Sequence, residues 1–143
     1  LFRSKDLQKR KGTALLLITH DMGVVAEMAD DVVVMYSSRA VEQGSVFEIF
    51  DDMSHPYTQG LFLSRPHIST KLGSLPTIQG NVPPLTNRPN GCHFSPRCPY
   101  AISQCQVGDV PEVILNSEKH KTLCWLYHES IQSSIKWKET VKK

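Results

Sequence analysis

Two short, wholly apolar runs flank a segment of helical periodicity near the start of the chain. Residues 14–18 and 32–35 contain no polar side chain, which is typical of strands covered on both faces of a mostly parallel sheet. Between them, apolar residues recur at helical spacing at Val24, Val25, Met28 and Ala29, and this spacing predicts an amphipathic helix. The pattern therefore predicts a strand–helix–strand unit with parallel strands.

The first residues and the segment after residue 36 carry signals for the ends of further elements. Residues 1–10 are typical of a helix that stops at Gly12. A glycine often follows the last turn of a helix, and this last turn is basic. The polar turn at 37–39 should return the chain as an antiparallel strand over 40–43. We expect this strand to form one edge of the sheet.

Two short helices are predicted after that strand. Ser45 and Glu48 fit a capping box, in which each residue satisfies a backbone N–H of the other, ahead of a helix through Phe50. Pro56 suits the first position of a second helix because its φ angle is already helical. Three apolar residues of that helix should face the core: Tyr57, Leu61 and Phe62.

The composition changes beyond residue 63. Prolines at positions 66, 76, 83, 84 and 89 exclude a long helix or a central strand over most of this segment. Residues 75–79 are the exception and could form a brief strand. These changes divide the chain into three predicted parts: an α/β part over 1–63, a cysteine-containing extension over 64–127, and a polar, basic tail over 128–143.

Composition limits the class of protein. The chain has 143 residues, 40% of them hydrophobic, and a formal net charge of +2, so one core is the default expectation. The basic residues gather at the two ends without a recognition motif, and we predict no nucleic-acid partner. No apolar run approaches the roughly 18 residues of a membrane span. Because the sequence begins with Leu1 and not with methionine, we interpret the chain as a piece of a longer protein.

His20 is the one chemically active side chain of the strand–helix–strand unit. It follows the first predicted strand, at the edge of an α/β sheet where ligands gather, and Asp21 follows it. An imidazole there could donate a hydrogen bond to an anionic group. From the tripeptide Thr-His-Asp alone, the favoured interpretation is that His20 and Asp21 cap the helix and satisfy each other.

Four cysteines lie in the predicted extension, with gaps of five, six and eighteen residues: Cys92, Cys98, Cys105 and Cys124. Metal ligation would stabilise a segment that has little core of its own. Four thiolates suit an iron–sulfur cluster or zinc, although the gaps are not those of a zinc ribbon. Zinc could also take His93 or His120 in place of one thiolate. The remaining alternative is that the cysteines are free or disulfide-bonded.

Several ordered motifs resemble the ATP-binding subunits of ABC transporters, within the oligopeptide/dipeptide importers. Residues 18–26, Ile-Thr-His-Asp-Met-Gly-Val-Val-Ala, and residues 41–44, Val-Glu-Gln-Gly, are similar to the last part of the nucleotide-binding domain. Residues 55–58, 78–85 and 91–99 are similar to the C-terminal extension of that subfamily. The resemblance implies an α/β fold: the C-terminal part of a P-loop NTPase (ABC) nucleotide-binding domain, followed by a loop-rich cysteine-containing extension.

The resemblance also implies an activity. The intact subunit would hydrolyse ATP with Mg²⁺ to energise peptide import, with His20 as the switch histidine at the γ-phosphate and Asp21 in support. Its partners would be a second ATP-binding subunit, two membrane-spanning permeases and an extracytoplasmic solute-binding protein. It would lie peripherally on the cytoplasmic face of the cell membrane. Some members hold a [4Fe–4S] cluster in the extension, and all four cysteine positions match.

Three motifs of an ABC ATPase do not occur in the sequence. There is no Gly-x-x-x-x-Gly-Lys-Ser/Thr loop, no carboxylate after an apolar strand to hold Mg²⁺, and no Leu-Ser-Gly-Gly-Gln signature. We therefore expect this chain alone neither to bind ATP tightly nor to hydrolyse it. The alternatives are a non-catalytic metal-binding or regulatory module, or an importer subunit for nickel or another small solute. Ser38 departs from the family, which usually has a glycine in that turn.

Overall fold

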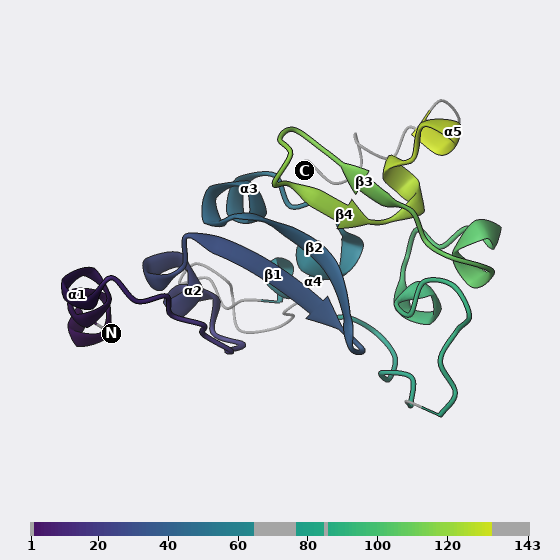
Figure 1. Cartoon of the computed structure of the whole chain (residues 1–143). Helices are drawn as coiled ribbons and strands as arrows, with labels where there is room; N and C mark the ends of the chain where they lie inside the picture. The colour runs from purple at the N-terminus through teal and green to yellow at the C-terminus, as the bar shows by residue number, and fades with distance from the viewer. Residues whose placement is uncertain (1, 65–76, 85, 133–143) are drawn as a thin grey trace.

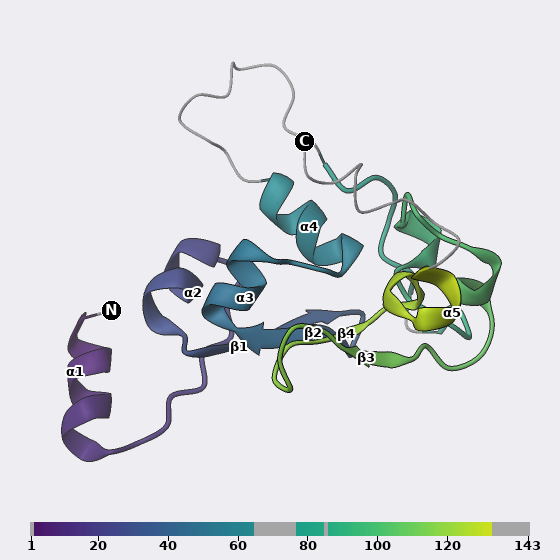
Figure 2. The ribbon, with the colours of Figure 1, turned by 90° about the horizontal axis from the view of Figure 1, so that it is seen from above.

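An antiparallel sheet in the order β1-β2-β4-β3 organises the molecule, with α3 and α4 on one of its sides (Figures 1 and 2). The computed structural model describes residues 2–64, 77–84 and 86–132. The strands are β1 (Asp31–Tyr36), β2 (Arg39–Ser45), β3 (Glu112–Ile114) and β4 (Lys121–Leu123). The helices are α1 (Phe2–Lys11), α2 (Met22–Met28), α3 (Val46–Asp51), α4 (Pro56–Leu63) and α5 (Glu129–Gln132), with 3₁₀ turns η1 (Ser95–Arg97), η2 (Ser103–Gln106) and η3 (Trp125–Tyr127).

The first predicted strand is not formed, and the prediction of a mostly parallel sheet is wrong for the described residues. Residues 13–19 have no regular structure, and Leu16 and Ile18 are 88% and 91% exposed. A strand buried on both faces needs neighbours that accept its backbone hydrogen bonds and cover its side chains. Within the described residues no strand pairs with this segment, so its apolar side chains are not buried in a sheet.

The second predicted strand is formed, but only one of its faces is buried. Val34 and Tyr36 of β1 are buried, whereas Val33 and Met35 are 56% and 60% exposed. The strand pairs antiparallel with β2 across the predicted hairpin. The expectation that β2 forms an edge of the sheet is wrong, because β2 lies between β1 and β4. β1 therefore has the two-sided environment of an antiparallel strand at the end of a sheet rather than that of a central parallel one.

The hairpin turn at Ser37 and Ser38 has a backbone conformation that glycine adopts more readily than serine. Ser37 and Ser38 both have positive φ angles, 46° and 63°, as a two-residue turn of type I′ requires. Non-glycine residues are strained in this region. The departure from glycine is thus accommodated by strain and not by a different turn.

The predicted caps are confirmed. The hydroxyl of Ser45 accepts from the N–H of Glu48, and the carboxylate of Glu48 accepts from the N–H of Ser45 at 2.8 Å. Pro56 occupies the first turn of α4, and Gly12 ends α1 with a φ of 64°. Each of these signals lies within a few residues of the element that it bounds, which is why the sequence alone reveals it.

Two apolar clusters form the interior. The first joins β1, β2 and α3 to Phe94 of the extension, and its buried members are Val34, Tyr36, Val41, Ile49 and Phe94. The predicted inward residues Tyr57, Leu61 and Phe62 pack against it. The second is smaller and has Cys124, Leu126 and Tyr127 at its centre. Phe94 thus brings part of the extension into the core of the preceding part.

The sheet also crosses the predicted boundary at residues 63 and 64, because β4 of the extension pairs with β2. The division into three parts stays a prediction. The described part of the proline-containing segment, 77–84 and 86–91, contains no helix or strand, as its prolines predicted. Of the brief strand expected over 75–79, residues 75 and 76 lie outside the described residues and 77–79 are not a strand.

Candidate functional site

His20 lies on the exposed loop between α1 and α2, immediately before the cap of α2. Oδ1 of Asp21 accepts from the N–H groups of Gly23 and Val24, at 2.8 and 3.2 Å. Asp21 therefore caps the helix, as the simpler interpretation expected, but the described residues show no hydrogen bond between His20 and Asp21. His20 is exposed, and among the described residues its ring makes no hydrogen bond. Its proposed role at a phosphate remains a prediction.

The structure places the four cysteines in one region. All four are free thiols, and Cys105 and Cys124 are buried. Burial raises the pKa of Cys124 well above its ordinary value, and the proximity of Cys92, Cys98 and Cys105 raises it further. Burial likewise raises the pKa of Cys98 from 9.0 to about 12, with contributions from Cys92 and Cys105. The thiols are therefore close enough to influence one another although they span 33 positions of the sequence.

Backbone hydrogen bonds position Cys92. The N–H of Cys92 donates to the carbonyl of Cys105 at 2.8 Å, which joins the first and third cysteines of the set. Burial raises the pKa of Cys92, and the N–H groups of Phe94 and Ser95, which hydrogen-bond its thiol, oppose this change. N–H groups aimed at sulfur stabilise a thiolate.

The cysteine region does not show a formed metal site. Among the residues that the structure describes, no three or more His, Cys, Asp or Glu side chains are grouped so that they could hold one ion. The two histidines considered as zinc ligands contact other groups. Nδ1 of His93 lies 3.0 Å from the carbonyl oxygen of Ser37, and Nε2 of His120 lies 3.2 Å from Glu42. The geometry as it stands supports neither an iron–sulfur cluster nor zinc.

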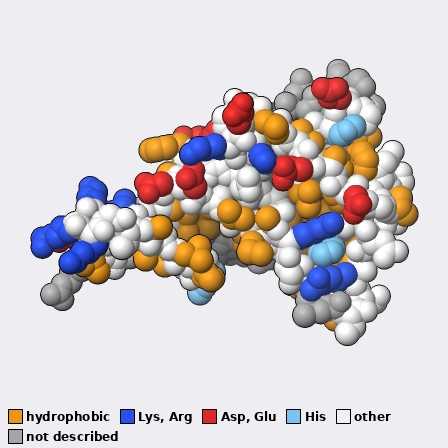
Figure 3. Space-filling model, viewed as in Figure 1, with side chains coloured by type: hydrophobic (Ala, Val, Ile, Leu, Met, Phe, Trp, Pro, Cys, Tyr) orange, Lys and Arg blue, Asp and Glu red, His pale blue; other side chains and the backbone are white. Residues whose placement is uncertain are grey.

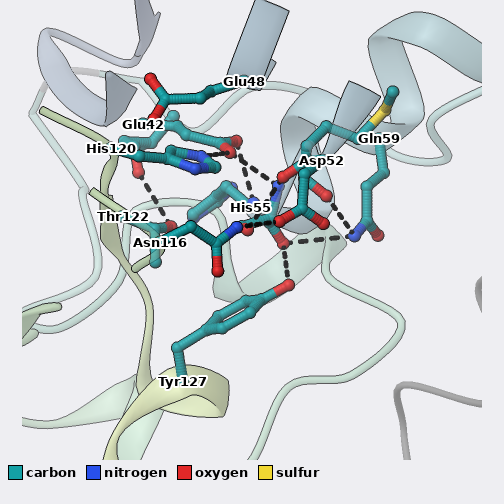
Figure 4. Close-up of polar contacts among 12 residues, drawn as sticks. Glu42, Glu48, Asp52, His55, Gln59, Asn116, His120, Thr122 and Tyr127 are labelled. Atoms are coloured by element: carbon teal, nitrogen blue, oxygen red, sulfur yellow. Dashed lines mark hydrogen bonds and ion pairs between the residues drawn. The ribbon is translucent and has the colours of Figure 1, made fainter. Parts of the chain in front are cut away.

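A buried carboxylate, Glu42 on β2, forms the best-defined polar centre of the molecule. It is 2% exposed and accepts from the N–H of Ser54 at 2.6 Å, the N–H of His55 at 2.9 Å and Nε2 of His120 at 3.2 Å. Figure 4 shows the ring of His120 beside this carboxylate. Since a buried charge is costly without partners, the three contacts account for its burial.

Further polar contacts join the α/β part to the extension, and Figure 4 shows the one made by Tyr127. The hydroxyl of Tyr127 donates to the carbonyl of Ser54 at 3.0 Å, and the hydroxyl of Ser117 donates to Glu48 at 2.6 Å. The Ser117 and Ser45 hydroxyls lower the pKa of Glu48 from 4.5 to about 2. The β3–β4 hairpin and the turn after it are therefore hydrogen-bonded to a carboxylate and a carbonyl of the α/β part.

Arg97 has a role that the sequence did not indicate. Its guanidinium donates to the carbonyls of Ile78 and Gln79, both at 2.9 Å, and lies 6.0 Å from the ring centroid of Tyr36. It therefore fastens residues 78 and 79 to the core.

Sequence reasoning missed Glu42, His55 and His120 as one unit. A glutamate within a strand pattern, two residues before Gly44, is the only local signal that could have pointed to it. Its histidine partner lies 78 positions away along the chain, and no periodicity connects the two.

The surface is uneven in charge and polarity. Lys9, Arg10 and Lys11 end α1, and Figure 3 shows the basic side chains gathered on this protruding helix.

Among the described residues, none of the helices is both long and apolar enough to cross a membrane.

Comparison with known proteins identifies the class. Residues 41–105 match the family described as "Oligopeptide/dipeptide transporter, C-terminal region". The chain is 43% identical over 125 residues to the oligopeptide transport ATP-binding protein AppD of Bacillus subtilis, and 41% identical over 124 residues to the oligopeptide transport ATP-binding protein OppD of Haemophilus influenzae. Each alignment covers 87% of this chain and 38% of the relative.

A third relative is the dipeptide transport ATP-binding protein DppD of Haemophilus influenzae, 45% identical over 101 residues, which are 71% of this chain and 31% of the relative. These relatives are all named as ATP-binding proteins of oligopeptide or dipeptide transport, and that is the class which the comparisons indicate. Within that class, the chain belongs to the oligopeptide/dipeptide family and corresponds to its C-terminal part. It spans about two fifths of the length of its relatives.

Proposed function

We propose that this chain is part of the ATP-hydrolysing subunit that energises peptide import through an ABC transporter. The observation that carries the proposal is the similarity to oligopeptide and dipeptide transport ATP-binding proteins over most of the chain. Hydrolysis would need the phosphate-binding loop, the Mg²⁺-holding carboxylate and the signature motif, none of which occurs in the sequence. ATP and Mg²⁺ are therefore cofactors of the intact subunit and not of this chain alone.

In the proposed reaction His20 contacts the γ-phosphate and helps to align the attacking water. Its exposed ring, with no hydrogen bond among the described residues, is free to make that contact. A neutral imidazole can donate one hydrogen bond to a phosphate oxygen while its second nitrogen accepts from another group. Asp21 supports this role indirectly, because it fixes the start of the helix that follows His20.

The proposed setting follows from the same class. A second ATP-binding subunit would complete the nucleotide sites, two permeases would span the membrane, and a solute-binding protein would deliver the peptide. The subunit would lie on the cytoplasmic side of the membrane as a peripheral component. Nickel or another small solute is the alternative cargo, and a non-catalytic regulatory module is the alternative function.

Two preparations test the proposal. Magnesium-dependent ATP hydrolysis should be absent from the isolated chain and present in a full-length subunit that contains it. Turnover by the isolated chain, abolished by His20→Ala, would show that the missing motifs are not needed. A full-length subunit that binds no ATP would favour the regulatory module.

The metal centre at Cys92, Cys98, Cys105 and Cys124 also stays a proposal. Its support is the donor set itself, four thiols in one region with backbone N–H groups aimed at several of them; soft metals prefer such ligands. Iron, sulfide and zinc analysis of protein purified anaerobically tests it. Iron with sulfide indicates a cluster, zinc without sulfide contradicts the cluster, and the absence of all three contradicts any metal centre.

A further inference from the structure

The four cysteines are divided between two apolar clusters. Cys92 and Cys98 pack against the first cluster, which is built on β1, β2 and α3, and Cys105 is joined to Cys92 by a backbone hydrogen bond. Cys124 belongs to the second cluster, with Leu126 and Tyr127. Cys124 can therefore lie beside the other three only when the two clusters are docked together.

Hydrogen bonds dock the second cluster on the α/β part. β4 pairs with β2 through Thr122 opposite Glu42, and the Thr122 hydroxyl donates to the carbonyl of Val41 at 3.3 Å. The hydroxyl of Tyr127 reaches the carbonyl of Ser54. These hydrogen bonds form a seam between the two parts, and opening it is a local event that separates the clusters without unfolding the whole chain.

Glu42 is the charged group at the centre of this seam. Two of its three hydrogen bonds come from the backbone of its own α/β part, at Ser54 and His55. The third comes from His120, which is fully buried and lies next to β4. Hydrogen bonds to a buried charge are stronger than neutral ones. Cys124 follows the three residues of β4 directly, so a contact that holds His120 also restrains the strand that leads to Cys124.

We propose that Glu42 is the positioning residue of the cysteine set: by binding His120 it keeps β4 paired with β2 and so holds Cys124 beside the other three thiols. The inference uses the same cysteines as the proposed metal centre, but it concerns the protein's own contacts. It holds whether or not a metal binds.

The test measures how fast each cysteine reacts with N-ethylmaleimide in the folded chain, with a chelator present and peptide mass spectrometry as the readout. In His120→Leu, which removes the donor, alkylation of Cys124 should accelerate about tenfold or more. Cys92, which packs on the first cluster, should change much less. Glu42→Gln should have the same selective effect on Cys124.

His120→Gln provides the rescue, because its side-chain amide can still donate to Glu42. Alkylation of Cys124 in this variant should stay close to the wild-type rate. Glu112→Gln is the matched control: it removes a carboxylate from the same hairpin, but one whose 3.2 Å ion pair with Lys121 is exposed. This control should leave Cys124 protected.

Three outcomes would overturn the inference. One is an unchanged rate at Cys124 in both His120→Leu and Glu42→Gln. Another is an equal rise at all four cysteines, which would mean that the Glu42–His120 contact contributes only to global stability. The third is equal acceleration in His120→Gln and His120→Leu. None of these results depends on metal content or ATP hydrolysis, so failure here is separate from failure of the proposed function.

Discussion

Replacement of Gly91 by alanine should destabilise the cysteine region because there is no room for a Cβ atom. A Cβ built on Gly91 would lie 2.4 Å from the carbonyl oxygen of Cys105, whereas ordinary contacts begin at 3.4 Å. The backbone would have to separate by about 1 Å to accommodate it. The same carbonyl accepts from the N–H of Cys92 at 2.8 Å, and the separation would take this pair beyond the roughly 3.5 Å range of a hydrogen bond.

The cost has two parts. Steric overpacking costs about 1–3 kcal/mol, and the lost hydrogen bond costs about 1 kcal/mol. Together they lower the free energy of unfolding by about 2–4 kcal/mol, which shifts a urea midpoint by about 1–2 M for a protein of this size. Urea unfolding followed by tryptophan fluorescence measures the shift.

Gly108→Ala is the control for this prediction. Gly108 has a φ of +71° and no atom within 4 Å of an added Cβ, so alanine there adds backbone strain of about 1–2 kcal/mol but no clash. Gly91→Ala should therefore cost more than Gly108→Ala and should also speed alkylation of Cys92. Equal or smaller destabilisation at Gly91 would refute the close packing of its loop on Cys105.

Three further predictions concern pH and the hairpin turn. Burial lowers the pKa of His55 from 6.5 to about 3; the unfolded chain takes up a proton below pH 6.5 and the folded chain does not, so stability should fall as the pH drops from 6.5 towards 3. His55→Asn keeps an acceptor for the N-cap and should flatten this dependence in urea titrations; an unchanged slope would contradict the assignment. The pKa of Glu48 is lowered from 4.5 to about 2, chiefly by the hydroxyl of Ser117, so its stabilisation is present above pH 4.5 and is lost as the pH falls towards 2. Ser117→Ala should raise that pKa in an NMR titration and move acid unfolding to higher pH, and a carboxyl that titrates as before would rule out the contact. Ser38→Gly should relieve the strain at a φ of 63° and raise the free energy of unfolding by about 0.5–1 kcal/mol; a less stable protein would show that the turn is not strained.

Local signals in the sequence predicted local structure well. The capping box at Ser45 and Glu48, the helix start at Pro56 and the helix end at Gly12 are all formed. Each depends on hydrogen bonds or fixed φ angles within a few residues. The hairpin between β1 and β2 is also local, and the polar turn at 37–39 marks it.

Long-range pairing was not predictable in the same way. Residues 14–18 have the composition of a buried strand, but composition cannot supply the neighbouring strand that would make it one. The pairing of β2 with β4 joins residues about 80 positions apart, and β4 is only three residues long. The antiparallel order of the sheet could therefore not be deduced from the apolar pattern.

The candidate site was predictable only in part. The cysteines could be named from the sequence because their chemistry is distinctive, and His20 could be named because its surroundings resemble a known motif. The contact between Glu42 and His120 could not be predicted, since it arises from burial and from a pairing that the fold creates. A polar residue that pairs with a distant residue in the interior leaves no pattern in the sequence around it.

The most direct test of the proposed function is ATP hydrolysis by a full-length subunit in which His20 is replaced by alanine. Single-turnover hydrolysis and ATP affinity are measured separately, with Asp21→Asn as a neighbouring control that can still cap α2. We predict that His20→Ala binds ATP with near wild-type affinity but hydrolyses it at least about a hundredfold more slowly than the wild type. Asp21→Asn should keep most of the activity. Wild-type turnover in His20→Ala would contradict the assignment of His20 to the γ-phosphate.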